Sequence, residues 1–471
     1  MRRTKIVATL GPATHNPEIL HGLISVGADV LRLNFSHGTR DDHARLVTMA
    51  RAAAKRAGRE VGLLGDIPGP KLRLGDIRGD VMHLRNGQSL VLTTNSADGR
   101  RDSIPVAWQG LPNAVHRDDV IYLADGSIRL RVQDTAEGEV LTKVETGGTV
   151  TSHQGMNLPG VEALPAAVGE SDLEWVDFAV EQDLDLLAVS FVRHASDLDS
   201  VQARLTERDA DIPVIAKIEK REAAENAEEI VQACSGGIMV ARGDLGIELP
   251  IEEIPQVQKR LLRLAGHYSK PCITATQMLA SMVRSTRPTR AEATDVANAV
   301  YDGTDALMLS EETAIGEYPV EAVKMMSRIA EVTERDLPYD EWLARRTHHA
   351  QHDVGETLAY SAVVAAYQLD LAALVVPTRS GRTARLVSAH HPRLPVLALS
   401  GRPGTVRRLQ LLFGVTAAHY EEPAILDELL DGCAARARDL GLASSGDLIG
   451  ITAGLASQRL GTNLLEVHRV P

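Results

Sequence analysis

Cysteine, aromatic residues and long apolar runs are all scarce in this sequence of 471 residues. The three cysteines, Cys234, Cys272 and Cys433, are scattered and lack the spacing of metal ligands, which argues against a disulfide framework and against a cysteine metal site. No apolar run is long enough to cross a membrane, and the segment from Met1 to Lys5 does not resemble a signal peptide. We therefore expect a cytoplasmic protein with reduced thiols and no membrane partner.

Positive charge is also in deficit, because the formal net charge is −13 at pH 7. Nucleic acid binding rests on clustered positive charge, so this balance argues against nucleic acid as the main partner. An anionic substrate would have to be held by local basic groups within an acidic surface. Lysine is scarce while arginine is abundant, so a lysine inside a motif indicates a need for the compact ammonium group.

Eight short apolar runs recur along the chain, and most are followed by a helical pattern. Strands that alternate with helices predict a parallel sheet, and eight such units predict a closed (β/α)8 barrel of the TIM type. A doubly wound open sheet is the competing fold, but no G-x-G-x-x-G motif follows the first run. The runs are Lys5–Leu10, Val30–Asn34, Val61–Asp66, Leu184–Phe191, Val214–Glu219, Gly237–Asp244, Pro271–Gln277 and Ala306–Glu311.

Two further domains are predicted outside the barrel. Between the third and fourth runs, hairpin signals separate short β-rich pieces such as Ser89–Thr94 and Ser127–Val132, which predicts a small all-β domain inserted as a lid. After about Glu334 the strand and helix pattern restarts as a separate α/β domain. The predicted boundaries are 1–70 and 166–340 for the barrel, 71–165 for the lid and 341–471 for the C-terminal α/β domain.

Two of the apolar runs end in paired charges. V-I-A-K-I-E carries Lys217 and Glu219, and I-M-V-A-R-G-D-L-G carries Arg242 and Asp244. Residues two apart in an extended strand point to the same side, so each pair would project together from a strand end. A carboxylate from each of two strands can hold one Mg²⁺, and a lysine beside that metal suits an anionic substrate. The alternative is that these charges only cap two buried strands.

Polar and basic groups follow the second and third runs as well. Arg32 and Arg73 are planar forks suited to phosphate, although either arginine alone could be a surface ion-pair partner. Barrel active sites lie at the C-terminal ends of the strands, so these groups predict an anion-binding site there. The residues are Arg32, Asn34 and Ser36 on one face after the second run, and Asp66, Lys71 and Arg73 around a Gly-Pro turn after the third.

Taken together, these motifs resemble the pyruvate kinase family over essentially the whole chain. The resemblance implies a barrel, an inserted lid and a C-terminal regulatory domain, usually in a homotetramer. It also implies the transfer of a phosphoryl group from phosphoenolpyruvate to ADP, giving pyruvate and ATP, with Mg²⁺ or Mn²⁺ as cofactor. The matching segments include T-K-I-V-A-T-L-G-P, L-R-L-N-F-S-H-G, G-M-N-L-P-G, M-V-A-R-G-D-L-G-I-E, I-T-A-T-Q-M-L and E-A-T-D-V-A-N-A-V-Y-D-G-T-D-A-L-M-L-S-E-E-T-A.

The same resemblance implies a role for each motif residue. Glu219 and Asp244 resemble the Mg²⁺ ligands, and Lys217 resembles the lysine that stabilises charge on the phosphoryl group in flight. In phosphoryl transfer the protein mainly positions groups and offsets charge, and these residue types suit that task. By resemblance, Arg32, Lys217, Gly243, Asp244 and Thr276 bind substrate, Arg73, Asn34 and His37 bind nucleotide, Arg32 and Arg73 meet phosphate, and Thr276 and Ser310 lie near the water chain that protonates the enolate.

One departure from the family pattern concerns the monovalent cation. Lys71 stands where many members have a glutamate, and it resembles the lysine of the members that need no K⁺ because the ammonium replaces the cation. Asn34, Ser36 and Asp66, which resemble the K⁺ ligands, are nevertheless present. We expect activity that does not require K⁺.

Two other departures lie elsewhere. Ser171 occupies the place of a lid-hinge lysine that reaches the nucleotide in the family, and no lysine occurs between Lys143 and Lys217 to replace it. Glu311 stands in place of a glycine in S-G-E-T-A, and the sequence offers no physical account of it.

The C-terminal domain carries a candidate effector loop, P-T-R-S-G-R-T, between a predicted strand and a predicted helix. Hydroxyl groups and glycine at a helix start favour an anion, although an ordinary helix cap is the alternative. By resemblance, this loop is a phosphate pocket for a phosphorylated allosteric effector. Its residues are Thr378, Arg379, Ser380, Gly381, Arg382 and Thr383.

The sequence therefore predicts an ADP-dependent phosphotransferase. One alternative is another Mg²⁺-dependent barrel enzyme that handles phosphoenolpyruvate or pyruvate, such as an aldolase, and an ADP requirement would separate the two. A second alternative is a catalytically weakened regulatory paralogue, which Ser171 suggests.

Overall fold

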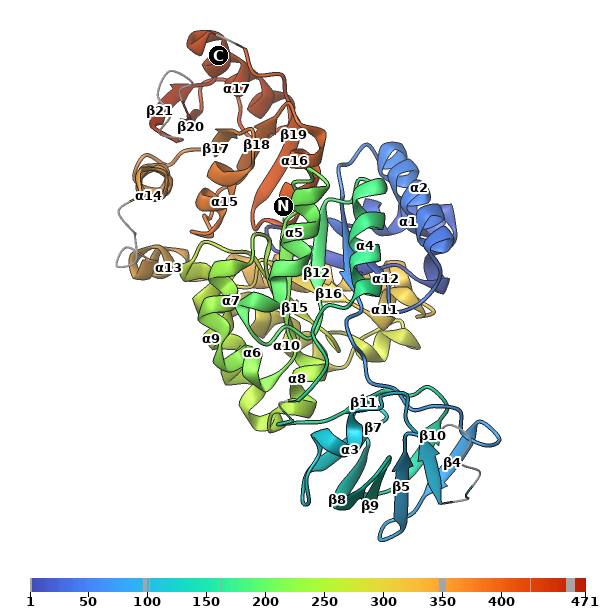
Figure 1. Cartoon of the computed structure of the whole chain (residues 1–471). Coiled ribbons are helices and arrows are strands. Elements are labelled where there is room, and N and C mark those ends of the chain that lie inside the picture. Colours follow the sequence, from blue (N-terminus) through green and yellow to red (C-terminus); the bar gives the residue numbers. More distant parts are fainter. Residues whose placement is uncertain are drawn as a thin grey trace.

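The computed structural model of the chain describes residues 2–95, 100, 102–161, 163–346, 353–423, 425–454 and 462–471. Figure 1 shows a central barrel with a small β domain at one end and an α/β domain at the other. The barrel is closed and parallel, and every predicted run forms one of its strands within a few residues. Around the barrel the order is β1 (Lys5–Thr9), β2 (Val30–Asn34), β3 (Gly62–Ile67), β12 (Leu186–Val189), β13 (Val214–Ile218), β14 (Gly237–Ala241), β15 (Cys272–Ala275) and β16 (Ala306–Leu309), which pairs with β1.

Helices surround the barrel because each presents an apolar face to the strands. Helix α2 (Arg40–Ala57) illustrates the local signals: Thr39 and Asp42 form a capping box at its start, and Gly58, at φ 62°, ends it. The other helices of this layer are α1 (Pro17–Ser25), α4 (Glu170–Glu181), α5 (Asp199–Glu207), α6 (Arg221–Glu225), α7 (Ala227–Ala233), α8 (Arg242–Glu248), α9 (Ile254–His267), α10 (Arg290–Tyr301), α11 (Glu311–Ala314) and α12 (Pro319–Thr333).

Alternation along the strands explains how the barrel interior becomes polar at one end. An apolar layer inside the barrel includes Val30, Leu64 and Ile215. Side chains two residues further along a strand point to the same interior, and there the sequence changes to Arg32, Asp66 and Lys217. The buried core thus supports a layer of charge at the C-terminal ends of the strands.

The inserted domain is all β, as predicted. Its six-stranded sheet has the order β11-β7-β8-β9-β5-β6, and β10 pairs with β4 in a second, two-stranded sheet. The exact domain boundaries, 71–165, stay a prediction. The strands are β4 (Val81–Leu84), β5 (Ser89–Thr93), β6 (Ser103–Pro105), β7 (Val120–Leu123), β8 (Ile128–Ala136), β9 (Glu139–Thr146), β10 (Gly148–Thr151) and β11 (Met156–Asn157), with a short helix α3 (Leu111–Ala114).

The C-terminal domain contains a five-stranded sheet of order β19-β18-β17-β20-β21, in which β21 is antiparallel to β20. Helix α13 (Tyr339–Arg346) precedes the sheet of this domain in the chain, and residues 347–352 lie outside the described residues. The strands are β17 (Ala373–Pro377), β18 (Val396–Ser400), β19 (Val415–His419), β20 (Leu448–Ala453) and β21 (Leu464–Arg469), and the helices are α14 (Val354–Gln368), α15 (Arg382–Ser388), α16 (Pro403–Arg408) and α17 (Leu426–Asp439).

The C-terminal domain covers the end of the barrel where the N-terminal ends of the strands lie. Leu411, which precedes β19, belongs to the same buried cluster as the interior residues Val7 and Val30. Lys5 Nζ donates to the Val415 carbonyl at 2.6 Å, and Arg407 Nε donates to Asp185 Oδ1 at 2.7 Å. With the N-terminal end of the barrel covered, the open C-terminal end faces the β domain (Figure 1).

Candidate active site

A buried network of charges joins four barrel strands at their C-terminal ends. The two oxygens of Asp66 serve different cations: Oδ2 accepts from Arg32 Nε at 2.7 Å, and Oδ1 lies 3.3 Å from Lys217 Nζ. Lys217 Nζ also lies 2.8 Å from Glu219 Oε1 and donates to Ser190 Oγ at 2.7 Å. The side chains of Arg32 and Lys217 are thus fixed by buried acceptors and cannot rotate freely.

Electrostatics favour the charged forms of Asp66 and Lys217. Burial alone would raise the pKa of the Asp66 carboxyl, but Lys217 and Arg32 bring that pKa below its ordinary value. Burial alone would lower the pKa of Lys217, but Asp66 and Glu219 bring it above its ordinary value. Lys217 therefore presents a permanent positive charge inside the barrel mouth.

Asp244 is the second carboxylate near Glu219. Burial, and then repulsion from Glu219, raise the pKa of Asp244 to about 6, while Lys217 and Lys71 oppose the shift. Two neighbouring carboxylates with excess negative charge fit a hard divalent cation, and Mg²⁺ takes one or two carboxylates together with substrate oxygens. Among the described residues no group of three or more His, Cys, Asp or Glu side chains could hold a metal ion.

The expectation that Arg242 and Asp244 extend from a strand is wrong. Strand β14 ends at Ala241, and both residues lie in the first turn of α8. Successive positions on a helix diverge by about 100°, so the two side chains do not share a face. The Arg242 guanidinium forms an ion pair with Asp295 at 2.8 Å, away from the carboxylate pair.

Thr276 lies opposite the start of α8 in an unusual conformation. Its φ is 72°, a value that a β-branched residue rarely adopts. Its hydroxyl oxygen accepts from the Gly243 backbone N–H at 2.7 Å and donates to the Ala275 carbonyl at 2.7 Å. A side-chain atom at Gly243 would lie 3.3 Å from Thr276 Oγ1, so the close approach favours glycine. Gly243, Asp244 and Thr276 therefore form one compact unit, which is called the carboxylate cradle below after the role proposed for it.

Lys71, Arg73 and His37 lie on the lid side of the mouth. Burial lowers the pKa of His37, and the charges of Arg73, Lys71 and Arg32 lower it further. The charge of Lys71 also opposes the rise in the pKa of Asp244, so its ammonium is near enough to act on both His37 and Asp244. Arg73 Nη1 donates to the His153 carbonyl of the lid at 3.2 Å. The segment that leads from β3 into the inserted domain thus places two basic side chains, Lys71 and Arg73, near the barrel mouth.

The predicted shared face of Arg32, Asn34 and Ser36 is only partly correct. Strand β2 ends at Asn34, and Ser36 lies in the turn that follows. The Asn34 side-chain oxygen accepts from the Ser36 backbone N–H at 3.2 Å, so the asparagine stabilises the turn. A period of two cannot be extended beyond the end of a strand.

Ser310 and its neighbours close the ring of strand ends. The Ser310 N–H donates to Glu312 Oε2 at 2.7 Å, and the other oxygen of Glu312 accepts from the Leu279 N–H at 3.0 Å. Glu311 is exposed at the first position of α11, where an acidic residue is compatible with the helix start. A glutamate in place of the glycine of the family pattern therefore needs no room in the protein core.

Ser171 lies exposed in the first turn of α4. Its neighbour Asp172 accepts from the Gly169 N–H at 2.8 Å and from the Gly69 N–H at 3.2 Å. Asp172 thereby joins the helix start to the turn that leads to Lys71. The hinge remains structurally intact although its lysine is missing.

Sequence reasoning missed Ser190, which receives the Lys217 hydrogen bond. A period of two from the buried residues Leu186 and Ala188 would have placed Ser190 in the barrel interior. Thr9, which accepts from Arg32 Nη1 at 3.1 Å through its hydroxyl, was also missed. Both hydroxyls position cations rather than carry charge, and a charge pattern does not reveal such residues.

The predicted effector loop connects β17 to the seven-residue helix α15. Gly381 has φ 86°, and its N–H donates to Thr378 Oγ1 at 3.1 Å. The guanidinium groups of this loop are partly exposed and pair with acids: Arg379 with Glu422 at 3.0 Å, and Arg382 with Asp353 at 3.1 Å. The Ser380 hydroxyl lies 3.5 Å from the Arg382 N–H, and buried Thr383 bonds to Thr462 through its hydroxyl.

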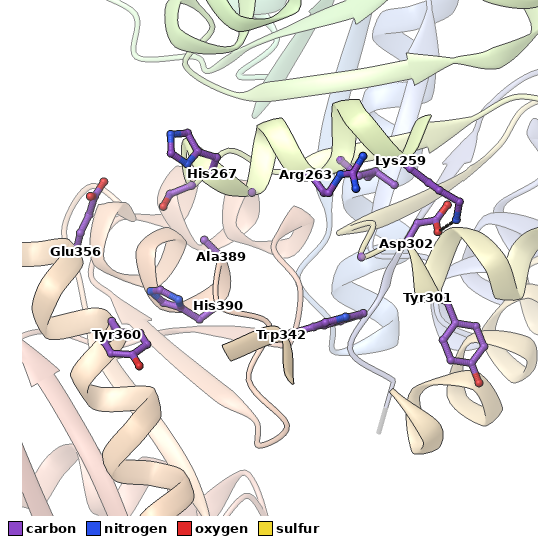
Figure 2. Close-up of a pocket in the computed structure, with 14 residues that line it drawn as sticks. Lys259, Arg263, His267, Tyr301, Asp302, Trp342, Glu356, Tyr360, Ala389 and His390 are labelled. Atoms are coloured by element: carbon purple, nitrogen blue, oxygen red, sulfur yellow. Dashed lines mark hydrogen bonds and ion pairs between the residues drawn. The ribbon is translucent and has the colours of Figure 1, made fainter. Parts of the chain in front are cut away.

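A pocket of about 370 Å³ lies away from these groups, between the barrel and the C-terminal domain (Figure 2). Helix α9 contributes Lys259, Arg263 and His267, while Glu356 and Tyr360 come from α14. None of the residues of the barrel mouth described above lines it, so this cavity is not the candidate active site.

The C-terminal mouth of this closed parallel barrel holds two fixed basic side chains, two adjacent carboxylates and a strained hydroxyl residue. This combination defines an enzyme that handles an anionic substrate. Family models agree with this class: the pyruvate kinase barrel domain matches residues 1–323, and the pyruvate kinase alpha/beta domain matches residues 356–468. The chain belongs to the pyruvate kinase family.

Individual relatives resemble the chain over its whole length. A pyruvate kinase of Geobacillus stearothermophilus is 43% identical over 471 residues, covering 99% of this chain and 80% of the relative. One of Thermococcus litoralis is 41% identical and covers 100% of this chain and 99% of the relative. The crystal structure of a pyruvate kinase from Cryptosporidium parvum superposes with a TM-score of 0.94 at 36% identity, covering 100% of this chain and 96% of that one. No helix in the described part of the chain has the length and apolarity of a membrane span.

Proposed function

We propose that this chain is a glycolytic phosphotransferase, which moves the phosphoryl group of phosphoenolpyruvate to ADP and yields pyruvate and ATP. Membership of the pyruvate kinase family supports this reaction. The observation that carries the proposal within the site is the ion-paired network of Arg32, Asp66, Lys217 and Glu219 beside Asp244. Its fixed charges suit a reaction in which the protein mainly positions phosphate and offsets charge.

In the proposed reaction a β-phosphate oxygen of ADP attacks the phosphorus, and the bond to the enol oxygen breaks. Lys217 and Arg32 face the phosphoryl group, because both are held at the barrel mouth by Asp66. Arg73, Asn34 and His37 lie on the lid side and bind the nucleotide. The enolate then takes a proton at its methylene carbon through water near Thr276 and Ser310.

Glu219 and Asp244 would hold Mg²⁺, or Mn²⁺ in its place. When bound, the cation supplies charge that offsets the phosphoryl oxygens and the two carboxylates. The cradle of Gly243, Asp244 and Thr276 receives the substrate carboxylate. Burial of these groups within the barrel mouth excludes water once the lid domain is seated.

Lys71 replaces a monovalent cation in this proposal, so K⁺ is not required. Asp66, which would be a K⁺ ligand, gives its oxygens to Arg32 and Lys217. The other oxygens that resemble K⁺ ligands belong to Asn34 and Ser36. An ammonium group near Asp244 already supplies the positive charge.

Control and assembly complete the proposal. The loop Thr378–Thr383 would bind the phosphate of an allosteric effector in a cytoplasmic homotetramer. Arg379 and Arg382 can exchange their present carboxylate partners for phosphate, because both pairs are partly exposed.

A coupled assay of pyruvate formation tests the function. We expect turnover only when phosphoenolpyruvate, ADP and Mg²⁺ are all present, with and without K⁺. Turnover that is independent of ADP would favour another barrel enzyme of phosphoenolpyruvate or pyruvate. Tight substrate binding without turnover would favour a weakened regulatory paralogue.

A further inference from the structure

Arg242 donates hydrogen bonds to the Thr276 carbonyl of the carboxylate cradle and to the Ala275 carbonyl that precedes it. Its Nη2 donates to the Thr276 carbonyl at 2.9 Å, and its Nε donates to the Ala275 carbonyl at 3.3 Å. The guanidinium therefore bridges from the start of α8, where Gly243 and Asp244 lie, to the end of β15, where Thr276 lies. Its side chain is only 13% exposed, so these bonds are protected from water.

The conformation of Thr276 requires such support. Thr276 and the following residue Gln277 both have positive φ, 72° and 54°. Strained backbone of this kind persists only where the surroundings fix it. The carbonyls of Ala275 and Thr276 both accept hydrogen bonds from Arg242, and these two bonds fix the orientation of the turn.

Arg242 is in turn held by a chain of polar groups, of which Asp295 is partly exposed and Gln258 is buried. Its Nη1 donates to Asp295 Oδ1 at 2.8 Å and to Gln258 Oε1 at 3.4 Å. Gln258, which is 5% exposed on α9, uses its amide nitrogen to donate to Asp302 Oδ2 at 2.9 Å. Because the Gln258 oxygen accepts and its nitrogen donates, only an amide satisfies both partners.

The chain ends at the pocket of Figure 2. The remaining oxygen of Asp302 pairs with Lys259, and both side chains line that pocket on the barrel side. Continuous hydrogen bonds therefore run from this interdomain pocket through Asp302, Gln258 and Arg242 to the Thr276 carbonyl.

We propose that Arg242 is a positioning residue for the substrate carboxylate, and that Gln258 and Asp302 set its orientation. This inference rests on the proposed role of Gly243, Asp244 and Thr276. Arg242 touches no substrate in this arrangement, because its guanidinium donates to the backbone behind Thr276. Its loss lets the turn at Thr276 relax, which separates the hydroxyl from the Gly243 N–H.

The consequence is specific to one substrate. Arg73, Asn34 and His37, which are proposed to bind ADP, belong to the lid connection and to the end of β2, and none of them contacts the Arg242 chain in the described structure. Disturbing Arg242 or Gln258 should therefore weaken phosphoenolpyruvate binding and leave ADP binding unchanged.

The experiment uses Arg242→Gln, Arg242→Lys and Gln258→Met in the full chain. Loss of charge-assisted hydrogen bonds in Arg242→Gln should raise KM for phosphoenolpyruvate about tenfold to a hundredfold, with KM for ADP within about twofold. Arg242→Lys keeps the charge but not the fork, so it should restore part of the affinity. Gln258→Met keeps the shape of the helix surface and should raise the same KM about threefold to tenfold.

A direct binding measurement separates positioning from chemistry. Calorimetric titration of each variant with phosphoenolpyruvate and Mg²⁺, without ADP, should give the same ratio of dissociation constants as the KM values. Arg260→Met is the matched control, because Arg260 lies on α9 with Gln258 but donates to the Ala224 carbonyl at 2.8 Å, away from Arg242. It should leave both KM values unchanged.

Two outcomes overturn the inference. One is an unchanged KM for phosphoenolpyruvate in folded Arg242→Gln and Gln258→Met. The other is an equal rise in both KM values, which would mean that Arg242 only supports the fold. Where Arg242→Gln fails to fold, the milder Gln258→Met decides.

Thr276→Ala distinguishes the inference from the site on which it rests. When this variant leaves KM for phosphoenolpyruvate unchanged, the carboxylate cradle itself is wrongly assigned. When it raises KM while Gln258→Met and Arg242→Gln do not, only the positioning role of Arg242 fails.

Discussion

Lys217 Nζ and Asp66 Oδ1 are 3.3 Å apart, although the whole β domain separates the two residues in sequence. The other oxygen of Asp66 holds Arg32, so a single carboxylate fixes the spacing of two cations. Insertion of the β domain after β3 does not disturb this spacing, since β3 and β12 pair directly in the barrel. The barrel alone therefore determines the spacing of Arg32 and Lys217, the two residues proposed to face the phosphoryl group.

Lys217→Ala and Asp244→Ala should each abolish turnover while the fold stays intact. Removal of one preorganised charge at the phosphoryl group should cost about 3–4 kcal/mol or more of transition-state stabilisation. The measurement is kcat at saturating phosphoenolpyruvate and ADP, with circular dichroism to verify folding.

Lys324→Ala is the control for Lys217→Ala, because Lys324 is half exposed and pairs with Glu321, one turn earlier on α12. It should keep normal kcat. A folded Lys217→Ala enzyme with near-normal kcat would contradict the assignment of the phosphoryl site.

Sequence periodicity predicted the barrel because parallel strands in a closed barrel are buried on both faces and therefore read as short apolar runs. Lys217 and Glu219 were correctly paired, since the chain stays extended through Ile218. Arg242 and Asp244 were misread because the strand ends at Ala241 and a helix follows at once. Whether a charged run continues as a strand or begins a helix depends on tertiary packing, which the local pattern does not contain.

Hydroxyl positions and long-range contacts were the least predictable features of the site. Ser190 carries no charge, and its importance comes only from the distance to Lys217. The contact of Arg242 with the Thr276 carbonyl joins two strand ends that the sequence cannot bring together without the barrel order. The residue types at the mouth were predictable, whereas their partners required the fold.

Activity should be largely independent of K⁺, because the Lys71 ammonium supplies the positive charge. Lys71→Glu should lose activity, since the new carboxylate would add to the negative charge near Asp244. Added K⁺ should restore part of that activity through the oxygens of Asn34 and Ser36, together with Asp66, whose carboxylate K⁺ would share with Arg32 and Lys217. The check is a titration of kcat against K⁺ at constant ionic strength, with tetramethylammonium as the balancing ion. A strong K⁺ requirement in the unmodified protein would rule this role out.

Ser171→Lys should lower KM for ADP more than KM for phosphoenolpyruvate. The side chain is exposed in the first turn of α4, so a lysine fits without displacing the Asp172 cap. A charged contact to phosphate is worth about 1.5–3 kcal/mol. Ser200→Lys, at an exposed site on α5, adds the same charge elsewhere and should change neither constant. When Ser171→Lys also changes neither constant, another group already serves the nucleotide.

Stability should rise with pH between pH 8 and pH 9.5 because of Lys5. Burial lowers the pKa of Lys5 from 10.5 to about 8, and the nearby Asp29 offsets part of that shift. Below pH 8 both states are protonated and the burial penalty is complete. Between the two pKa values the unfolded state binds more protons, so the free energy of unfolding rises, by about 1–2 kcal/mol over this interval.

Urea unfolding at pH 8 and pH 9.5 measures this effect. Lys5→Met should remove the rise, whereas Lys324→Met should retain it, because Lys324 is half exposed. An equal rise in the unmodified protein and in Lys5→Met would assign the pH dependence to other groups.

Arg382→Ala should remove most of the activation by a phosphorylated effector while sparing maximal velocity. The hydroxyls of Thr378 and Ser380 lie at the backbone N–H groups of Gly381 and Arg382, and Arg379 and Arg382 add two guanidinium groups to the same loop, a combination that favours a dianionic phosphate. The pair of Arg382 with Asp353 is exposed, so its loss should cost little stability.

The measurement is the half-saturating phosphoenolpyruvate concentration with and without a panel of sugar phosphates and nucleoside monophosphates. A coupling of about 1–3 kcal/mol is typical of such control. Arg402→Ala, at an exposed arginine of the same domain, is the control and should keep full activation. The loop lies close to the segment that covers the barrel: a side chain at Gly381 would lie 3.0 Å from Leu409, two residues before Leu411, which belongs to the buried cluster inside the barrel. An anion that orders the loop would therefore act on the floor of the barrel whose mouth holds the substrate. Activation that survives both Arg382→Ala and Ser380→Ala would place the effector elsewhere and leave this loop a helix cap.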